Sequence, residues 1–310
     1  MKLVVSLVPG ALTDPILSGA CGIEGAELDV RQAKMVDGNS RQMLDLAFDV
    51  AEMSLATFTK ARAEGAPLIG LPVFTGRRFL EPGMGARPEA GIEHPAQLAG
   101  KRVGVPQFWM TSSVWHRAVL SNVYGVPENT IEWITVQPER FDLPFTPGVK
   151  VTHRPGEKLD ELLRRGEIDA VMFPRPVEEH FDAALARRPF PYVVAAQRAF
   201  HSKTGIFPIM HFVVMKEALH RDRPGLARRV IDAFQRAKDT ILAKPAAIPA
   251  RDLPFHGADF GYARGVLGDD PWPYGIAANA PALQWFLARA HEQGLTRRRL
   301  APEALFVESE

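Results

Sequence analysis

The sequence predicts an α/β fold with largely parallel sheets. Short apolar runs alternate with periodic helical segments over most of the 310 residues, an order typical of strands joined by helices. The length allows two domains, and a weak internal repeat indicates that they share one plan. The predicted strands cover residues 3–8, 48–53, 67–74, 102–105, 131–136, 168–173 and 209–215.

The predicted helices have recognisable ends. Ser, Thr or Asn before a helix caps it, and glycine commonly follows its last turn. The expected caps and helices are Ser40 before 41–46, Ser54 before a helix running to Glu64, and Thr111 or Ser112 before a helix that ends ahead of Gly125. Long amphipathic helices are expected at 224–243 and 281–293.

Composition excludes several classes of protein. The net charge is +1 with no basic block, which argues against nucleic acid as the main partner. The single cysteine, Cys21, permits neither an intrachain disulfide nor a site with several thiolate ligands. No segment has the roughly 18 apolar residues of a membrane span.

The apolar N-terminus has two interpretations, a first strand or an export signal. Pro9, Asp14 and Pro15 interrupt the run LVVSLVPGAL, whereas a signal peptide needs an unbroken apolar core. A buried first strand is therefore preferred over a signal or lipoprotein segment. We expect a soluble protein located in the cytoplasm, and a homo-oligomer is possible.

The internal repeat places hydroxyl groups where ligands bind. The segment around Leu44 to Val50 resembles that around Leu163 to Ala170, and both join a helix to a strand that opens with Asp. In each half a strand then runs into a helix that starts near a hydroxyl, Ser54 in one and Thr111 or Ser112 in the other. Ligands bind at the carboxyl edge of such sheets, and a helix N-terminus favours an anion. The alternative is that these hydroxyls only cap their helices.

Four sequence blocks carry a resemblance to a known family. They are FDVAEMSLATF (48–58), GKRVGVPQFWMTSSVW (100–115), IFPIMHFVV (206–214) and DPWPYG (270–275), with HEQGL (291–295) after them. Together they resemble the 4,5-dihydroxyphthalate decarboxylase-like family, which is related to the type II periplasmic substrate-binding proteins and more distantly to the NMT1/THI5-like group. The blocks follow the family's order and span nearly the whole chain.

The resemblance implies a bilobal α/β fold of the type II periplasmic-binding-protein kind. Two mixed, mostly parallel sheets flanked by helices would enclose a central cleft. Residues 1–82 and 208–310 would form the first lobe and 83–207 the second, with hinge crossings near 83–85 and 205–208. Closure of such a cleft expels water and strengthens charge contacts inside it.

Two segments depart from the family pattern. Members similar to the decarboxylase carry a segment like D-x-D-R-T after the first strand, where this chain has VPGALT (8–13). They also carry R-H-S after the third strand, where this chain has RRFLEPGMG (77–85). Both departures bear on the substrate and the reaction rather than on the fold.

The candidate catalytic residues are His211 and Glu52. Decarboxylation of a hydroxyaromatic acid needs no cofactor if an acid protonates the ring carbon that bears the carboxylate. His211 lies in the apolar strand PIMHFVV and has a suitable side chain, although a lone histidine there is often a core residue. Glu52 could donate a proton or orient His211, or it could simply favour the N-terminus of the helix that follows it.

The candidate binding residues supply charge and aromatic surface. Arg77, preferred over its neighbour Arg78, and Arg175 follow strands and could grip a carboxylate, while Arg175 could instead pair with Glu178 or Glu179. The aromatic candidates are Trp115, Trp272 and Tyr274 with Phe108 beside them, and the prolines around Trp272 favour exposure of its ring to a ligand over burial.

Neither metal-ligand spacing nor a nucleotide or serine-hydrolase motif is found, so no metal and no cofactor are expected.

Two functions remain open from the sequence. The first is a cofactor-independent decarboxylase, a lyase acting on a small hydroxyaromatic or conjugated carboxylate. The second is a non-catalytic solute-binding or sensor protein for a small carboxylate, similar to the substrate-binding proteins of ABC transporters. The interrupted N-terminal run favours the enzyme, and the two departures favour the binding protein.

Overall fold

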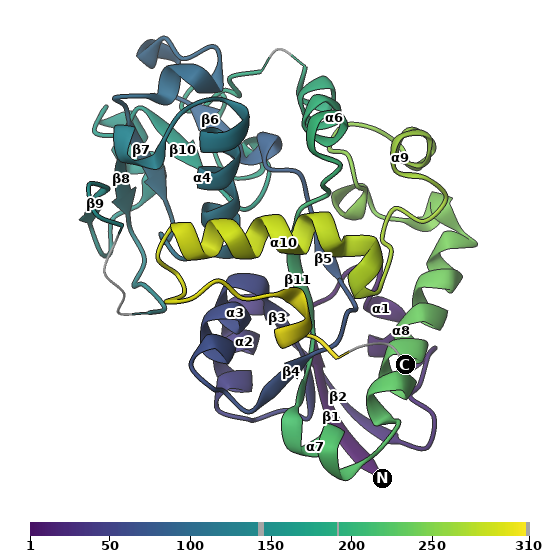
Figure 1. Cartoon of the computed structure of the whole chain (residues 1–310). Helices are drawn as coiled ribbons and strands as arrows, with labels where there is room; N and C mark the ends of the chain where they lie inside the picture. The colour runs from purple at the N-terminus through teal and green to yellow at the C-terminus, as the bar shows by residue number, and fades with distance from the viewer. Residues whose placement is uncertain (142–145, 191, 308–310) are drawn as a thin grey trace. The chain divides into compact units, whose positions relative to one another are not determined.

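The computed structural model describes residues 1–141, 146–190 and 192–307. The chain forms two compact units, each built from separate segments of the sequence (Figure 1). Unit 1 comprises Met1–Arg78, Ile209–Leu287 and Arg298–Glu310, and unit 2 comprises Phe79–Pro208 and Ala288–Arg297. The sequence indicated crossings near 83–85 and 205–208, and no sequence signal indicated that Ala288–Arg297 joins unit 2.

Unit 1 is organised around one mixed sheet. Its strand order is β2-β1-β3-β11-β4, and β5 pairs with β11 beside this path. The strands are β1 (Lys2–Leu7), β2 (Glu27–Gln32), β3 (Val50–Ser54), β4 (Leu68–Gly70), β5 (Gly76–Arg77) and β11 (Ile209–Lys216). β1 pairs in parallel with β2 and β3, whereas β11 is antiparallel to β3, β4 and β5. The returning strand β11 therefore lies inside the sheet.

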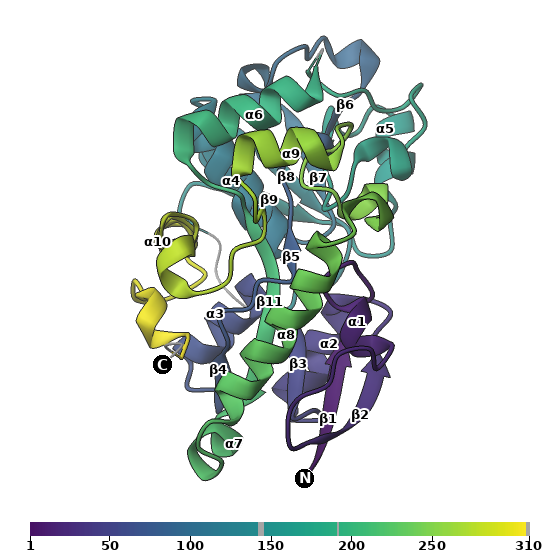
Figure 2. The same ribbon diagram turned by 90° about the vertical axis from the view of Figure 1, so that its right-hand side faces the viewer.

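Helices complete unit 1 and bury its apolar face. They are α1 (Asp14–Leu17), α2 (Val36–Leu44), α3 (Leu55–Ala63), α7 (Glu217–Asp222), α8 (Leu226–Leu242), α9 (Phe260–Leu267) and α10 (Ile276–Glu292), whose last turn belongs to unit 2. In Figure 2, α8 runs past the strands β1 and β2. Its residues Val230, Phe234 and Ala237 join Leu3 and Val5 in one buried apolar cluster, and such burial is the main stabilising contribution to the fold.

Unit 2 contains the second sheet. Its strand order is β6-β10-β7-β8-β9. The β6–β10 pair is antiparallel, and the pairs β10–β7, β7–β8 and β8–β9 are parallel. The elements are β6 (Met84–Ala86), β7 (Arg102–Val105), α4 (Thr111–Val123), β8 (Glu132–Thr135), β9 (Lys150–His153), α5 (Leu159–Arg164), β10 (Ala170–Met172) and α6 (Val193–Thr204). The apolar residues of α5 pack with β8 and β10 in a second core.

The predicted α/β fold with two mostly parallel sheets is confirmed, and the predicted strands lie where the sequence placed them within a few residues. The helix starts differ more. Ser40 does not cap a helix, because it lies inside α2 and its hydroxyl donates to the Val36 carbonyl at 2.7 Å. α4 starts at Thr111 with Met110 at the cap position, and Ser54 occupies the cap position of α3 without a side-chain capping bond. α10 starts at Ile276 and contains Pro281, so it begins before the residue that was expected to start it.

The structure gives the internal repeat a physical basis. In unit 1 the Asp49 carboxylate accepts a hydrogen bond from Val4 N at 2.9 Å and pairs with Lys216 Nζ at 2.9 Å. In unit 2 the Asp169 carboxylate accepts one from Arg102 N at 3.0 Å and pairs with the Arg102 guanidinium at 2.7 Å. Each aspartate thus ties the start of its strand to the backbone of the neighbouring strand.

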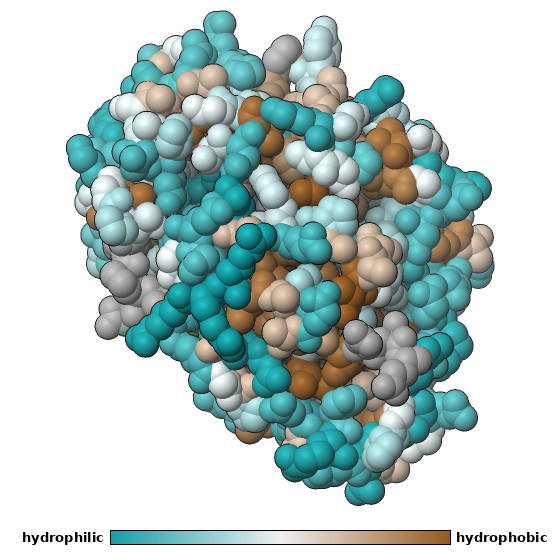
Figure 3. All heavy atoms as spheres, in the orientation of Figure 1, coloured by the Kyte–Doolittle hydropathy of each residue, from teal (hydrophilic) through white to brown (hydrophobic). Residues whose placement is uncertain are grey.

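The surface is mainly hydrophilic on the face shown in Figure 3, with hydrophobic residues gathered below the middle of that view. In the described part of the chain the exposed large hydrophobic residues are Met1, Met35, Leu46 and Tyr192. None of the described helices combines the length and apolar character needed to cross a bilayer.

One buried carboxyl group makes the stability depend on pH. Glu81 in unit 2 is fully buried, and burial raises its pKa from 4.5 to about 7, although the backbone N–H groups of Leu80 and Glu81 oppose the shift. In the unfolded chain the carboxyl ionises at its ordinary pKa. Ionisation therefore favours unfolding, and the stability falls as the pH rises from about 4.5 through 7.

We predict that Glu81→Gln increases the stability at pH 8, because the amide has no charge to desolvate. The shift corresponds to at most about 3 kcal/mol of unfolding free energy, and the advantage of the variant shrinks at pH 5.5. Thermal unfolding followed by circular dichroism at both pH values measures this. The exposed Glu24 provides the control variant Glu24→Gln, and an equal effect of Glu81→Gln at both pH values would contradict the prediction.

Candidate functional site

Glu52 and His211 meet on one face of the sheet in unit 1. In the antiparallel pairing of β3 with β11, Ser54 lies opposite His211 and Glu52 lies opposite Val213. Because opposite residues share a face and side chains alternate along a strand, Glu52, Ser54 and His211 all lie on the same face. His211 Nδ1 is 3.3 Å from Glu52 Oε1, and the two side chains are 22% and 4% exposed. The sequence-predicted catalytic pair is therefore a direct contact.

The Glu52 carboxylate is held on both oxygens. Oε1 accepts a hydrogen bond from the Thr75 hydroxyl at 2.9 Å, and Oε2 accepts one from Val8 N at 3.0 Å. Asn39 Nδ2 donates to the Glu52 carbonyl at 2.9 Å and to the Ser6 carbonyl at 3.0 Å, which ties β3 to β1. A buried carboxylate is stable only when such donors replace water, so this site presents a fixed anion beside an imidazole.

The imidazole of His211 has two different environments. Its Nδ1 faces the Glu52 carboxylate, so a proton on Nδ1 is stabilised. Nε2 is the ring nitrogen that does not face this carboxylate. Because the ring is partly exposed while Glu52 is buried, His211 is the member of the pair that a small molecule can reach. The arrangement can perform general acid chemistry.

The guanidinium of Arg77 is hydrogen-bonded to the loop that carries Trp272 and Tyr274. Its Nη2 donates to the Pro273 carbonyl at 2.9 Å and to Asn279 Oδ1, and its guanidinium lies 5.2 Å from the centre of the Phe74 ring. Burial lowers the pKa of Arg77 to about 9, against the opposing influence of Tyr274 and Asp270. These contacts give Arg77 a structural role in unit 1.

The aromatic side chain of Trp272 in the loop DPWPYG is packed inside unit 1 rather than exposed to a ligand. Trp272 is 3% exposed and stacks on Phe260 with ring centres 5.9 Å apart, so the expectation that the flanking prolines present it was wrong. Lys238 Nζ donates to Asp270 at 2.5 Å and to the Trp272 carbonyl at 3.0 Å, and it lies 4.1 Å from the centre of the Tyr274 ring. The buried ammonium, together with Arg77, fixes this loop.

The remaining predicted site residues belong to unit 2. Thr111 and Ser112 lie in the first turn of α4 and are each 5% exposed. Trp115 is fully buried on the same helix, as is Phe108 just before it, so both are core residues of the unit. Arg175 is exposed after β10. Its expected partner Glu178 pairs with Arg188 at 2.9 Å.

The segment after β1 brings in a carboxylate that the sequence analysis missed. Asp252 Oδ2 accepts a hydrogen bond from Ala11 N at 3.1 Å, and burial raises the pKa of Asp252, while the charges of Arg251 and Arg78 oppose the rise. A hydrogen bond also links the two ends of this segment, because the Thr13 hydroxyl donates to the Val8 carbonyl at 2.6 Å. The acidic group next to this segment is thus supplied from a remote part of the chain.

Thr75 is the other functional residue that sequence reasoning missed. A single threonine between the strands β4 and β5 carries no local signal, because its role depends on contact with β3. The predicted strand at 67–74 ends just before Thr75, which does not show what its hydroxyl contacts.

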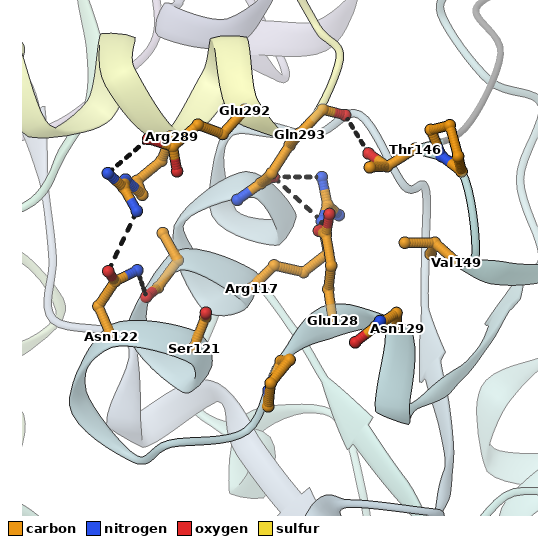
Figure 4. A pocket seen from close by; sticks show the side chains of 13 residues that line it. Arg117, Ser121, Asn122, Glu128, Asn129, Thr146, Val149, Arg289, Glu292 and Gln293 are labelled. Carbon is orange, nitrogen blue, oxygen red and sulfur yellow. Dashed lines mark hydrogen bonds and ion pairs between the residues drawn. The ribbon is translucent and has the colours of Figure 1, made fainter.

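A pocket of about 230 Å³ lies in unit 2, apart from every predicted site residue (Figure 4). Its charged side chains pair with each other or with neighbouring amides. Arg117 contacts Glu128 at 3.1 Å and Gln293 at 2.7 Å, and Arg289 contacts Glu292 at 2.6 Å and Asn122 at 3.1 Å. Two cations and two anions leave the lining without net charge, so it offers little attraction for a carboxylate.

Among the described residues, no group of three or more His, Cys, Asp or Glu side chains is placed to hold a metal ion.

Solved structures define the class of fold. The alkanesulfonate-binding protein SsuA from Xanthomonas axonopodis pv. citri, bound to MOPS, superposes with a TM-score of 0.56 over 99% of this chain and 98% of its own, at 11% identity. The desulfurization enzyme DSZB superposes with a TM-score of 0.54 over 99% and 96% of the two chains, at 18% identity. The chain has an α/β fold resembling that of periplasmic binding proteins, and this fold carries both binding and catalysis.

Sequence comparison identifies the family. A 4,5-dihydroxyphthalate decarboxylase from Comamonas testosteroni is 32% identical over 306 residues, which cover 94% of this chain and 92% of that protein. A second protein of that name, from Pseudomonas putida, is 31% identical over 169 residues, or 52% of this chain and 66% of its own length. A scan against models of protein families gives no match. The chain belongs to the 4,5-dihydroxyphthalate decarboxylase family, as the sequence blocks predicted.

We predict that Arg77→Met destabilises unit 1, because the Asn279 side chain and the Pro273 carbonyl lose a charged donor. Loss of such bonds costs about 1–3 kcal/mol of unfolding free energy. Denaturant unfolding measures it, with Arg41→Met as control because the Arg41 side chain is 60% exposed and pairs with Asp37 across one turn of the same helix. Equal stabilities of the two variants would show that Arg77 does not hold the loop.

Proposed function

We propose that the protein is a cofactor-independent decarboxylase of a hydroxyaromatic carboxylate, with 4,5-dihydroxyphthalate as the first substrate to test. The observation that carries the proposal is the 32% identity to a 4,5-dihydroxyphthalate decarboxylase over 94% of the chain. The Glu52–His211 contact supports it, because it supplies a proton donor of the kind that this reaction requires.

In the proposed reaction His211 is the general acid. The protonated imidazole transfers its Nε2 proton to the ring carbon that bears the carboxylate, which forms a C–H bond. The bond from that carbon to the carboxylate then breaks, CO₂ leaves, and the electron pair returns to the ring and restores aromaticity. One proton is consumed per turnover, and solvent returns it to the imidazole.

Glu52 acts through His211 in this scheme. The carboxylate contacts Nδ1, so it orients the ring and stabilises the imidazolium form from which the proton is donated. Glu52 is itself fixed by Val8 N and the Thr75 hydroxyl. Such preorganisation removes the need to rearrange donors during the reaction.

For the anchor of a substrate carboxylate we favour Arg78 over Arg77. The contacts of Arg77 with Pro273 and Asn279 engage its guanidinium in the fold. The charge of Arg78 acts on Asp252, whose carboxylate lies at the segment after β1, next to the strand end that supplies Val8 N to Glu52. Thr111, Ser112 and Arg175 of unit 2 stay predicted ligand contacts.

The experiment is an assay of the purified full-length protein with 4,5-dihydroxyphthalate. We expect release of one equivalent of CO₂ with formation of the corresponding dihydroxybenzoate, followed by chromatography and by trapping of CO₂. Binding of the compound, seen as a thermal shift, without its consumption would contradict the decarboxylase and support a carboxylate-binding protein.

We predict that His211→Ala lowers kcat by about 10²–10⁴-fold, the usual contribution of a positioned acid, while the circular dichroism spectrum stays unchanged. Glu52→Gln lowers kcat by a smaller factor, because the amide still fills the space but cannot stabilise the imidazolium. His220, which is exposed on α7, provides the control variant His220→Ala. Turnover of His211→Ala at the wild-type rate would remove His211 from the mechanism.

We predict that Arg78→Met raises KM by about tenfold or more with little change in kcat, because a charged hydrogen bond to a carboxylate contributes equally to the bound substrate and the transition state. Steady-state kinetics on both arginine variants, each corrected for its folded fraction, measures this. An unchanged KM in Arg78→Met together with a raised KM in Arg77→Met would transfer the anchor to Arg77.

A further inference from the structure

The Glu52–His211 contact depends on a two-residue segment, Thr75–Gly76. Glu52 Oε1 has two neighbours, the Thr75 hydroxyl at 2.9 Å and His211 Nδ1 at 3.3 Å. The hydroxyl donates to the same oxygen that faces the imidazole. Its position therefore decides how that oxygen is directed towards the ring.

Strand pairing fixes where Thr75 lies. The short strand β5 follows it directly and pairs with β11, with Gly76 opposite His211 and Arg77 opposite Ile209. The register between these pairs shifts at a bulge next to His211, and bulges often redirect a side chain beside a functional site. The same backbone pairing therefore brings Thr75 to Glu52 and Gly76 to His211.

Gly76 leaves room for the imidazole. A Cβ atom added to Gly76 would lie 2.8 Å from His211 Nδ1 and 2.9 Å from its Cγ, closer than non-bonded carbon and ring atoms approach. The backbone of Gly76 is outside the left-handed region, so the need for glycine here comes from the neighbouring ring and not from the local conformation.

We propose that Thr75 and Gly76 are positioning residues for the Glu52–His211 pair. The Thr75 hydroxyl directs Glu52 Oε1 towards Nδ1, and the missing side chain of Gly76 lets the ring lie over the backbone within reach of that oxygen. Together they select the tautomer with the proton on Nδ1, which leaves Nε2 as the reactive nitrogen. The catalytic part of this inference rests on the proposed function, whereas the geometric part does not.

The first test is the series Thr75→Val and Thr75→Ser. Thr75→Val keeps the shape but removes the donor, and we expect kcat to fall by about tenfold with KM unchanged, equivalent to about 1.4 kcal/mol of transition-state stabilisation. Thr75→Ser keeps the donor and restores most of the rate. Equal loss in both variants would show that the rate depends on packing at this position in general, and it would overturn the role of the hydroxyl.

The second test observes His211 itself by ¹⁵N NMR of its imidazole, assigned with the variant His211→Gln, at a pH where the ring is neutral. The wild type is expected to show a single tautomer with the proton on Nδ1. Thr75→Val and Gly76→Ala are expected to give mixed tautomer signals. Unchanged His211 signals in both variants would overturn the inference.

A matched control exists in unit 2. The Thr135 hydroxyl lies 2.8 Å from His153 Nδ1, so Thr135→Val also removes a threonine hydroxyl beside a histidine. We expect it to change the His153 signals and to leave those of His211 unchanged.

Failure of this inference and failure of the proposed function are distinguishable. If the wild type does not decarboxylate the substrate but the His211 signals respond to Thr75→Val and Gly76→Ala, the function is wrong and the positioning is right. If the wild type is active and neither variant affects the signals or kcat, the positioning is wrong and the function stands.

Discussion

The buried carboxylate of Glu52 is the constraint on which the arrangement of unit 1 depends. Taking a carboxylate out of water costs several kcal/mol unless donors and cations compensate for it. The compensation comes from three separate segments: Val8 N at the end of β1, Thr75 before β5, and His211 on β11. None of the three is near Glu52 in the sequence, so the carboxylate is satisfied only after β1, β3, β5 and β11 have come together. The geometry of the site and the topology of the sheet are therefore linked.

The antiparallel strand β11 makes this possible. β1, β2 and β3 form a parallel sheet, and a further parallel strand beside β3 would place its amino-terminal residues at the opposite end from Ser54. Because β11 runs the other way, its first residues lie beside the carboxyl end of β3. That edge is where open α/β sheets place their functional side chains. The chain returns from unit 2 immediately before β11, so His211 lies in the first residues of the returning strand.

Much of the fold could be predicted from the sequence because its buried strands are short apolar runs, such as IMHFVV in β11. β2 and β9 could not be, since ELDVRQ and KVTH are polar strands at the edges of their sheets with little buried surface. The pair Glu52–His211 was suggested by two sequence blocks, but the contact between them depends on strand register. Thr75 and Asp252 gave no local signal at all, because each acts only on a segment far away in the chain.

The departure from the family pattern after β1 has a structural counterpart. VPGALT has one side chain able to bond, the Thr13 hydroxyl, and that hydroxyl turns back to Val8 and Gly10. The segment therefore acts through its backbone, and its N–H groups at Val8 and Ala11 are already occupied by Glu52 and Asp252. These two N–H groups already donate to carboxylates of the chain itself, so they cannot also bind an anionic ligand. The charge of such a ligand would have to be balanced by a cationic side chain or by the imidazolium of His211. In the proposed function, arginine and histidine side chains therefore take the part that a backbone anion site plays in other α/β proteins.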